Sequence, residues 1–141
     1  MSDKLFLDTN LWVYFFTKDP QTKSQNIEAL IDHHADSIFM STQVLGELYH
    51  VLTRKQLFSR QEAEAFVVRL ISDFPIIPID TFSVTQSISF NLRYGYTYWD
   101  SLIIATALSS DCTVLYSEDM QHNQLIENKL RIINPFISLV P

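Results

Sequence analysis

The sequence contains very little glycine and cysteine, and each shortage excludes a class of site. Gly46 and Gly95 are its only glycines, too few for the glycine-rich loops that bind dinucleotides or nucleotide phosphates. Cys112 is its only cysteine, which excludes an intramolecular disulfide and a thiolate metal cluster. Because unpaired cysteine is typical of a reducing compartment, we expect a cytoplasmic protein.

Long apolar runs and an excess of basic charge are also missing. The longest uninterrupted apolar run covers only residues 11–16, whereas a membrane helix needs roughly 20 residues. The N-terminal residues, with Asp3 and Asp8, lack the apolar centre of a signal peptide. Ten Lys and Arg residues stand against sixteen Asp and Glu residues, giving a net charge of −6. Such a chain repels nucleic acid at long range unless cations or a local basic patch intervene.

Composition and length instead indicate a folded chain of about one domain. Hydrophobic residues make up 47% and charged residues 18% of the 141 residues, a balance typical of globular proteins. The sequence has no linker rich in Pro, Gly or Ser, no low-complexity tract and no repeat of 20 to 50 residues. We therefore expect a single domain over residues 1–141.

Short apolar segments alternate with stretches of helical periodicity along the whole chain. The expected strands are 5–7, 37–40, 76–79, 113–116 and 131–133. The expected helices are 24–34, 42–53, 59–71, 81–94 and 99–108, with another from residue 11. Strands that alternate with helices need crossover connections, so the chain is expected to form a mostly parallel sheet with helices on both faces. The predicted class is α/β, in three α/β/α layers.

Four acidic residues occur at positions where ligand sites form in such sheets. Asp8 directly follows the first strand and Asp119 lies just beyond the strand 113–116, so both can face one crevice at the carboxyl ends of the strands. Glu47 lies beside the apolar stripe of its helix, and Asp100 opens the most apolar helix of the chain. No Lys or Arg is adjacent to any of them in sequence, which suggests that a divalent cation, Mg²⁺ or Mn²⁺, supplies the missing positive charge.

Each acid taken alone also has a purely structural interpretation. Asp8 can form an Asx turn, Asp100 can cap its helix, Glu47 can be a solvated helix residue, and Asp119 can start a turn. Taken separately, these interpretations are the more common ones. Their shared position at converging strand ends favours one common site.

Further candidates lie along the helix that carries Glu47. His50 is three residues from Glu47 and can approach the site, although a surface or interface role is more common for such a histidine. The only local basic patch comprises Arg54, Lys55 and Arg60, at and just beyond the end of this helix. It can hold a phosphate backbone or an acidic partner, or it can simply reflect the enrichment of cations at helix C-termini.

Five segments resemble the PIN-domain nucleases, and among them the VapC-type ribonuclease toxins of toxin–antitoxin pairs. The segments are FLDTN at 6–10, STQVLGELYHVL at 41–52, YGYTYWDSLIIATAL at 94–108, LYSEDMQHNQLI at 115–126 and RIINPF at 131–136. The match is collinear from end to end and keeps four acids in the order of the family. This combination is far more specific than any one motif.

The resemblance implies an endoribonuclease that depends on Mg²⁺ or Mn²⁺, with RNA as substrate, a small antitoxin protein as partner and a homodimeric state. It implies that the acidic metal site is formed by Asp8, Glu47, Asp100 and Asp119, supported by Thr9, Asn10 and Ser117. Asp8 and Asp100 are then the expected direct ligands, while Glu47 and Asp119 act through water or orient the nucleophile. The chain departs from the family pattern at two positions. Asn123 stands where relatives often have Gly, and Glu118 lies next to Asp119, so either of these two acids can face the metal.

Three other classes of protein compete with this interpretation. A haloacid-dehalogenase-type phosphatase needs a second Asp where this chain has Asn10, and a receiver domain needs a Lys after a late strand, where none is suitably placed. A catalytically weak PIN-like scaffold for RNA binding or assembly is the more serious rival. It is disfavoured because such scaffolds can lose acids, whereas this chain has all four.

Overall fold

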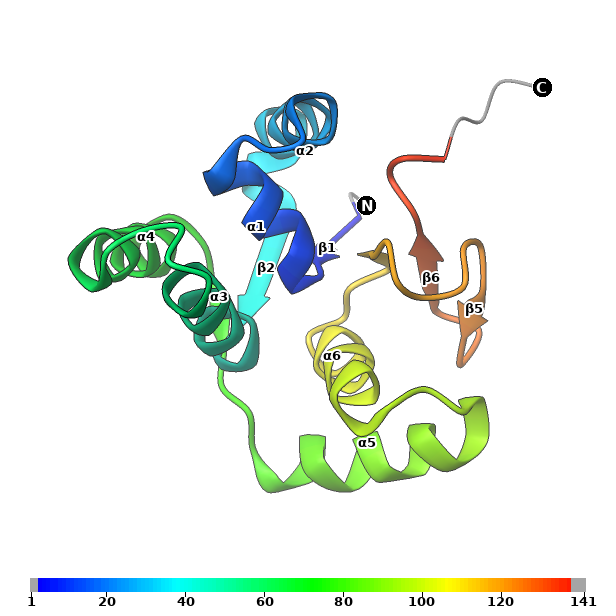
Figure 1. The fold of residues 1–141 in the computed structure, drawn as a ribbon. Coiled ribbons are helices and arrows are strands. Elements are labelled where there is room, and N and C mark those ends of the chain that lie inside the picture. Colours follow the sequence, from blue (N-terminus) through cyan, green and yellow to red (C-terminus); the bar gives the residue numbers. More distant parts are fainter. Residues whose placement is uncertain (1–2, 138–141) are drawn as a thin grey trace.

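The computed structural model describes residues 3–137, which form a six-stranded sheet with helices packed against it (Figure 1). The strands are β1 (Leu5–Leu7), β2 (Ile38–Ser41), β3 (Ile76–Ile77), β4 (Val114–Tyr116), β5 (Leu125–Ile126) and β6 (Leu130–Ile133). The helices are α1 (Thr9–Thr17), α2 (Gln21–His34), α3 (Thr42–Arg54), α4 (Arg60–Asp73), α5 (Thr81–Tyr94) and α6 (Tyr98–Ser109), with a short 3₁₀ turn at Ala35–Ser37. None of the described helices is long and apolar enough to cross a membrane.

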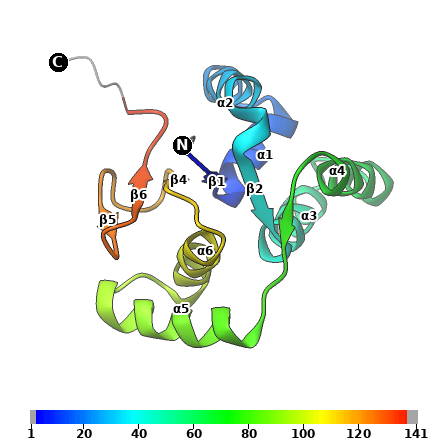
Figure 2. The same cartoon turned by 180° about the vertical axis from the view of Figure 1, so that it is seen from behind.

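The sheet has the order β3-β2-β1-β4-β6-β5, and only β5 runs antiparallel to its neighbour. β1 lies at the centre, where Phe6 is paired with Phe39 of β2 and with Leu115 of β4. Figures 1 and 2 show α5 and α6 side by side on one side of the sheet, with α1 to α4 grouped on the other side and around the β3 edge. The predicted three-layer α/β/α class with a mostly parallel sheet is therefore confirmed.

Helix α6 is the most deeply buried helix of the fold, as its sequence predicted. Residues 101–107 are all buried, because this helix is covered on one side by α5 and on the other by the sheet. Its first turn differs from expectation, since Trp99 is 60% exposed. The possible role of Asp100 as N-cap is wrong: Thr97 is the cap, and its hydroxyl accepts a hydrogen bond from the amide of Asp100.

Other element ends follow from local caps and turns. Helix α1 begins at Thr9, two residues earlier than expected, because the carboxylate of Asp8 accepts a hydrogen bond from the amide of Thr9 and caps the helix. The predicted capping box of Ser59 and Glu62 opens α4. Gly95 ends α5 with φ of 79°, as predicted. Asn123 adopts φ of 71°, the left-handed region that glycine favours, so this turn keeps a glycine-like conformation.

Two strand predictions at the sheet edges were inaccurate. The expected strand 76–79 is shortened to the two residues of β3, because Pro78 has no N–H to donate to a neighbouring strand. Strand β5 was not predicted at all. It pairs with β6 through only Leu125 and Ile126, too short a segment to show an alternating pattern.

Candidate active site

The site forms where two neighbouring parallel strands, β1 and β4, end side by side. Leu7 is paired with Tyr116, and the amide of Asp8 donates a hydrogen bond to the carbonyl of Tyr116 at 2.9 Å. Residues 117–119 continue from β4 at the same edge of the sheet. The geometry thus places the start of α1 directly beside the segment that carries Asp119.

A pocket of about 260 Å³, the carboxylate pocket, opens at this edge. Its lining comes from α1, α3, α6 and the segments that follow β1 and β4: Asp8, Thr9, Asn10, Glu47, His50, Val51, Asp100, Ile103 and Asp119. The four acids singled out in the sequence are therefore brought together in space, although they come from four separate segments. No Lys or Arg is among these lining residues.

Asp8 is the most buried of the four carboxylates, with 6% of its surface exposed. Its Oδ1 accepts a hydrogen bond from the amide of Thr9 at 2.8 Å, and its Oδ2 accepts one from the hydroxyl of Ser117 at 2.9 Å. Burial raises the pKa of Asp8 to about 7; these two hydrogen bonds lower it in part, and the charges of Asp100 and Asp119 raise it further. No positively charged side chain from residues 3–137 lines the pocket to stabilise the ionised form of Asp8.

Glu47 and Asp119 are each held by a polar side chain of α1. The hydroxyl of Thr9 donates to Oε1 of Glu47 at 2.7 Å, and the amide nitrogen of Asn10 donates to Oδ2 of Asp119 at 2.8 Å. The side-chain amide of Gln43, one helical turn before Glu47, donates a hydrogen bond to the backbone carbonyl of Trp99 at 3.0 Å. This hydrogen bond joins α3 to the start of α6. Consecutive residues of α1 thus position two acids that come from distant parts of the chain.

Asp100 is half-buried and faces the pocket from the first turn of α6. Burial raises the pKa of Asp100, and the negative charges of Asp119 and Glu47 raise it further. The four carboxylates therefore repel one another in the absence of a cation.

The two adjacent acids Glu118 and Asp119 point to different surroundings. Asp119 lines the pocket, whereas Glu118 accepts hydrogen bonds from the hydroxyl of Tyr14 at 2.5 Å and from the ammonium group of Lys23. Although burial opposes it, the hydrogen bonds from Lys23 and Tyr14 lower the pKa of Glu118. Asp119 is thus the acid of this pair that faces the other carboxylates.

The remaining candidates separate into one that lines the pocket and three that do not. His50 lies in the pocket wall, a position that its spacing from Glu47 had made possible. Arg54, Lys55 and Arg60 are exposed at the end of α3 and the start of α4, outside the lining. The structure therefore does not bring the basic patch into the carboxylate pocket itself.

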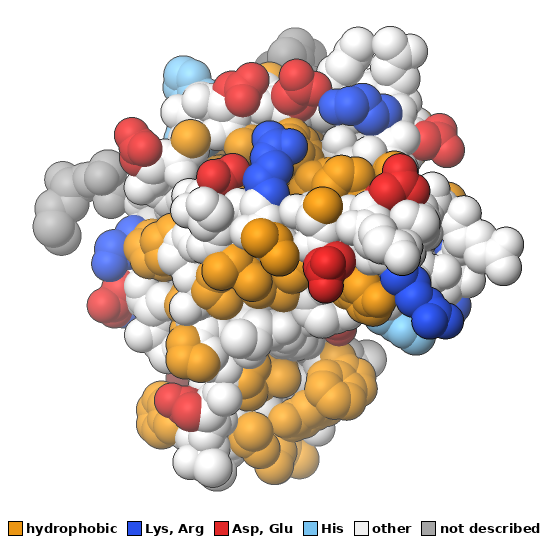
Figure 3. Space-filling model, turned by 90° about the vertical axis from the view of Figure 1, so that its left-hand side faces the viewer, with side chains coloured by type: hydrophobic (Ala, Val, Ile, Leu, Met, Phe, Trp, Pro, Cys, Tyr) orange, Lys and Arg blue, Asp and Glu red, His pale blue; other side chains and the backbone are white. Residues whose placement is uncertain are grey.

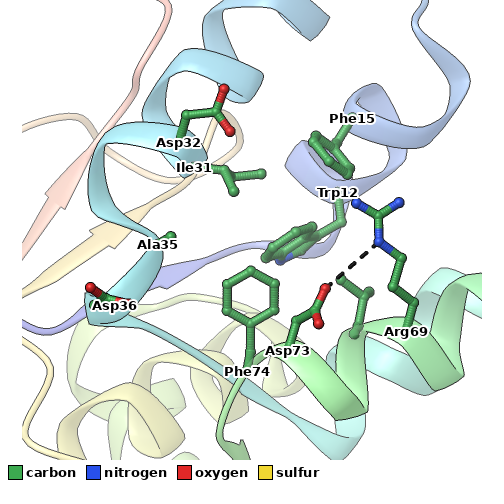
Figure 4. A pocket seen from close by; sticks show the side chains of 10 residues that line it. Trp12, Phe15, Ile31, Asp32, Ala35, Asp36, Arg69, Asp73 and Phe74 are labelled. Atoms are coloured by element: carbon green, nitrogen blue, oxygen red, sulfur yellow. Dashed lines mark ion pairs between the residues drawn. The ribbon is translucent and has the colours of Figure 1, made fainter.

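A larger pocket, of about 340 Å³, lies between α1, α2 and α4 (Figure 4). Figure 4 shows Trp12 at its centre, with Phe15 and Phe74 beside it and the ion pair of Arg69 and Asp73 nearby. Its walls are mainly aromatic and aliphatic, and it contains none of the four acids. Since reaction chemistry needs convergent polar groups, the smaller carboxylate pocket is the candidate active site.

The carboxylate pocket has the donor chemistry of a divalent-cation site but not a closed ligand shell. Among residues 3–137, no three acidic, histidine or cysteine side chains form a ready-made metal cluster. Mg²⁺ commonly binds proteins through one or two carboxylates and keeps several water ligands, so an open, oxygen-rich pocket is compatible with it. The buried carboxylate of Asp8 and the half-buried carboxylate of Asp100, which repel each other, fit such an ion.

Comparisons with known proteins agree on one family and one fold. The PIN domain family matches residues 5–127 of the chain. A toxin–antitoxin complex from Klebsiella pneumoniae has 18% identity and a TM-score of 0.71, with 94% of this chain and 98% of that chain covered. VapC20 of Mycobacterium tuberculosis, described as a toxin that cleaves the sarcin–ricin loop, has 18% identity and a TM-score of 0.68, with 82% and 90% covered.

A third solved structure is similar over nearly the whole chain. VapBC2 from Rickettsia felis, bound to a DNA fragment from its promoter, has 21% identity and a TM-score of 0.64, with 91% of this chain and 96% of that chain covered. A comparison with curated proteins finds no match. At such identities the likeness to solved structures shows the fold, while the family match rests on the sequence itself.

Proposed function

The chain belongs to the PIN domain family, a family of nucleases, and we propose that it is a divalent-metal-dependent endoribonuclease. The observation that carries this proposal is the pocket in which Asp8, Glu47, Asp100 and Asp119 converge from four segments with no Lys or Arg in its lining. Convergent carboxylates without a cationic side chain are the donor set expected for Mg²⁺ or Mn²⁺.

Asp8 and Asp100 would hold the cation directly, because burial and neighbouring negative charge make these two carboxylates the most in need of a positive partner. Glu47 and Asp119 would act through bound water. When bound, the cation would act as a Lewis acid on the scissile phosphate and lower the pKa of a water molecule.

The side chains around the acids would keep the carboxylates in place during hydrolysis. Ser117 and the amide of Thr9 fix both oxygens of Asp8, so this carboxylate cannot rotate freely. Thr9 and Asn10 donate to one oxygen each of Glu47 and Asp119. The second oxygen of Glu47 lies 3.5 Å from the side-chain amide of Gln43, whereas Oδ1 of Asp119 accepts no hydrogen bond from a described residue and can orient a water molecule or accept its proton.

We further propose that the protein is the toxin of a toxin–antitoxin pair, with a small antitoxin protein as partner, and that it forms a homodimer. The proposal of an antitoxin partner draws on the solved structures of similar fold, one of which is described as a toxin–antitoxin complex. The homodimer is what the resemblance to VapC-type toxins implies. The RNA substrate follows from the resemblance to VapC-type ribonucleases and from the toxin described as cleaving an RNA loop.

Cleavage of a mixed pool of single-stranded and hairpin RNA tests the proposed function. We expect cleavage with Mg²⁺ or Mn²⁺, none with EDTA, and a loss of orders of magnitude in the Asp8→Asn variant. The Asp36→Asn variant is a matched control, since Asp36 is exposed and outside the carboxylate pocket. RNA binding without any metal-dependent cleavage would instead indicate a PIN-like scaffold, and cleavage that survives EDTA would refute the metal dependence.

A further inference from the structure

His50 differs from every other polar residue in the carboxylate pocket. The remaining lining residues are the four carboxylates, two apolar residues, and Thr9 and Asn10, whose side chains each already donate a hydrogen bond, to Glu47 and Asp119 respectively. The imidazole of His50 is exposed and forms no hydrogen bond with a described residue. His50 is therefore a lining side chain with a donor whose polar atoms form no hydrogen bond with a described residue, so it is free to donate to a ligand.

Helix α3 continues from His50 away from the pocket. Residues three and four apart lie on the same side of a helix, so Glu47, His50 and Arg54 form one stripe along α3. At 1.5 Å per residue, the stripe rises about 10 Å from the pocket to the exposed guanidinium-bearing residue Arg54. The stripe begins at the carboxylates of the pocket and ends at the positively charged side chain of Arg54.

From this arrangement we propose that His50 and Arg54 form a phosphate-binding track for the RNA substrate. The scissile phosphate lies at the carboxylates, His50 donates a hydrogen bond to the adjoining phosphate, and Arg54 binds the phosphate beyond it. The proposal rests on the proposed nuclease function, because it is the bound cation that brings the first phosphate to the acids.

An RNA strand suits this stripe better than an acidic protein segment does. A peptide carboxylate that reached His50 would also meet Glu47 and Asp100 in the same pocket, without a metal-bound neighbouring group to hold it against their charge. A phosphate next to the scissile one is held there by covalent continuity with the metal-bound group. His50 is therefore a substrate-binding residue for a group that does not itself react.

The first test measures RNA binding without cleavage. The probe is a fluorescent 12-nucleotide single-stranded RNA of mixed sequence, with Ca²⁺ in place of Mg²⁺ and a gel to verify that the RNA stays intact. We expect His50→Ala to raise Kd about tenfold, as for a lost hydrogen bond to a charged group. Arg54→Gln should raise Kd and reduce the slope of log K against log salt by about 0.7, the value for one lost contact to a single strand.

Two matched variants control for the change of residue type. His33→Ala and Arg69→Gln replace exposed residues of α2 and α4 that do not line the carboxylate pocket, and we expect their Kd values to stay near that of the wild type. Steady-state cleavage with Mg²⁺ provides the second readout. KM should rise in His50→Ala while kcat changes little, because the contact is present in both the ground state and the transition state.

The outcomes separate this inference from the proposed function. Unchanged Kd and KM in His50→Ala and Arg54→Gln would overturn the track even if wild-type cleavage is intact. Weaker binding of an acidic peptide such as oligo-glutamate, with unchanged RNA binding, would overturn it in favour of a protein-binding stripe. Weaker RNA binding in both variants, in a protein that never cleaves RNA, would support the track and refute the nuclease.

Discussion

Asp8 has the most unusual environment of the four carboxylates. It is buried at the end of β1, it accepts two hydrogen bonds, and its pKa is raised to about 7 from an ordinary value of 3.8. Because the folded state then binds a proton more tightly than the unfolded state, the stability that Asp8 contributes is fully present below pH 4. It is lost as the pH rises from about 4 to 7.

This pKa shift predicts a pH-dependent difference between the wild type and the Asp8→Asn variant without metal. Asparagine keeps the shape of the side chain and carries no charge at any pH. Relative to the wild type, the variant should therefore become more stable by on the order of 2–4 kcal/mol between pH 4 and pH 8. Urea denaturation in EDTA at several pH values measures the difference.

The control for this prediction is Asp36→Asn, whose exposed carboxyl group lies outside the carboxylate pocket. Its unfolding free energy should follow that of the wild type across the pH range. Parallel curves for Asp8→Asn and the wild type would show that Asp8 is not protonated by burial in the folded protein.

The positions of the acids were predictable from sequence. The family resemblance also named Thr9, Asn10 and Ser117 as supporting residues, but not which acid each one contacts. Asp8 and Asp119 could be placed by the rule that the carboxyl ends of parallel strands share one edge. The choice between Glu118 and Asp119 depended on the direction of each side chain, which the sequence does not reveal. The pairings of Thr9 with Glu47 and of Asn10 with Asp119 likewise join segments whose relative distance only the fold determines.

The segment that follows β4 is anchored to the first two helices by Glu118. Its carboxylate binds Tyr14 of α1 and Lys23 of α2, and the ammonium group of Lys23 also lies over the ring of Phe136. Glu118 is only partly exposed, so these contacts are better shielded from water than a surface ion pair. They hold the residue next to Asp119 and thereby limit the movement of that acid.

Replacing Glu118 by Gln should weaken this anchor without removing a pocket carboxylate. We expect a loss of about 1–2 kcal/mol in the free energy of unfolding, as for a shielded hydrogen bond to a charged group. We also expect a fall in kcat of a few fold, because Asp119 becomes less well positioned. Chemical denaturation and steady-state cleavage measure the two effects.

Glu28→Gln is the matched control for the anchor. Glu28 and Lys18 form an exposed pair at 3.8 Å, which should contribute little. If Glu118→Gln were as stable and as active as Glu28→Gln, the contacts of Glu118 would not position the segment.

Elements with strong periodicity or clear caps were predicted well, and elements defined by their neighbours were not. The burial of α6 followed from its apolar residues on all sides, and the end of α5 followed from Gly95. The edge strand β5 forms because the backbone groups on the free side of β6 are available for hydrogen bonding. The two residues of β5 form too short a segment to predict this pairing. Helix α1 began early because Asp8 both ends a strand and caps a helix.

Considered as a whole, the molecule exposes several apolar side chains on α5 and on α4. On α5, Leu92 is 81% exposed, with Phe82 and Ile88 also exposed, whereas Ser83 and Ser87 of the same helix are buried. On α4, Val68 and Ile71 are exposed. Figure 3 shows hydrophobic side chains gathered at the level of α4 and, lower on the same face, of α5. A helix that buries serine and exposes leucine is better suited to a protein interface than to water.

We predict that the proposed homodimer forms through α5. The double substitution of Ile88 and Leu92 by Ser should cost roughly 1.5–3 kcal/mol for each side chain removed from the interface, which is enough to yield monomers at micromolar concentration. Light scattering coupled to size-exclusion chromatography gives the mass. Val68→Ser on α4 is the control and should stay dimeric. A dimer that persists in the double variant would exclude α5 as the interface.

The central claim is that the four carboxylates bind a divalent cation, and thermal unfolding with and without Mg²⁺ tests it most directly. Mg²⁺ at about ten times its Kd should stabilise the wild type by roughly 1.4 kcal/mol, a few degrees in Tm. Asp100→Asn should be at least as stable as the wild type without metal, because it removes repulsion from Asp119 and Glu47, and should gain less from Mg²⁺. An equal rise in Tm for both proteins, or no rise in the wild type, would contradict the claim.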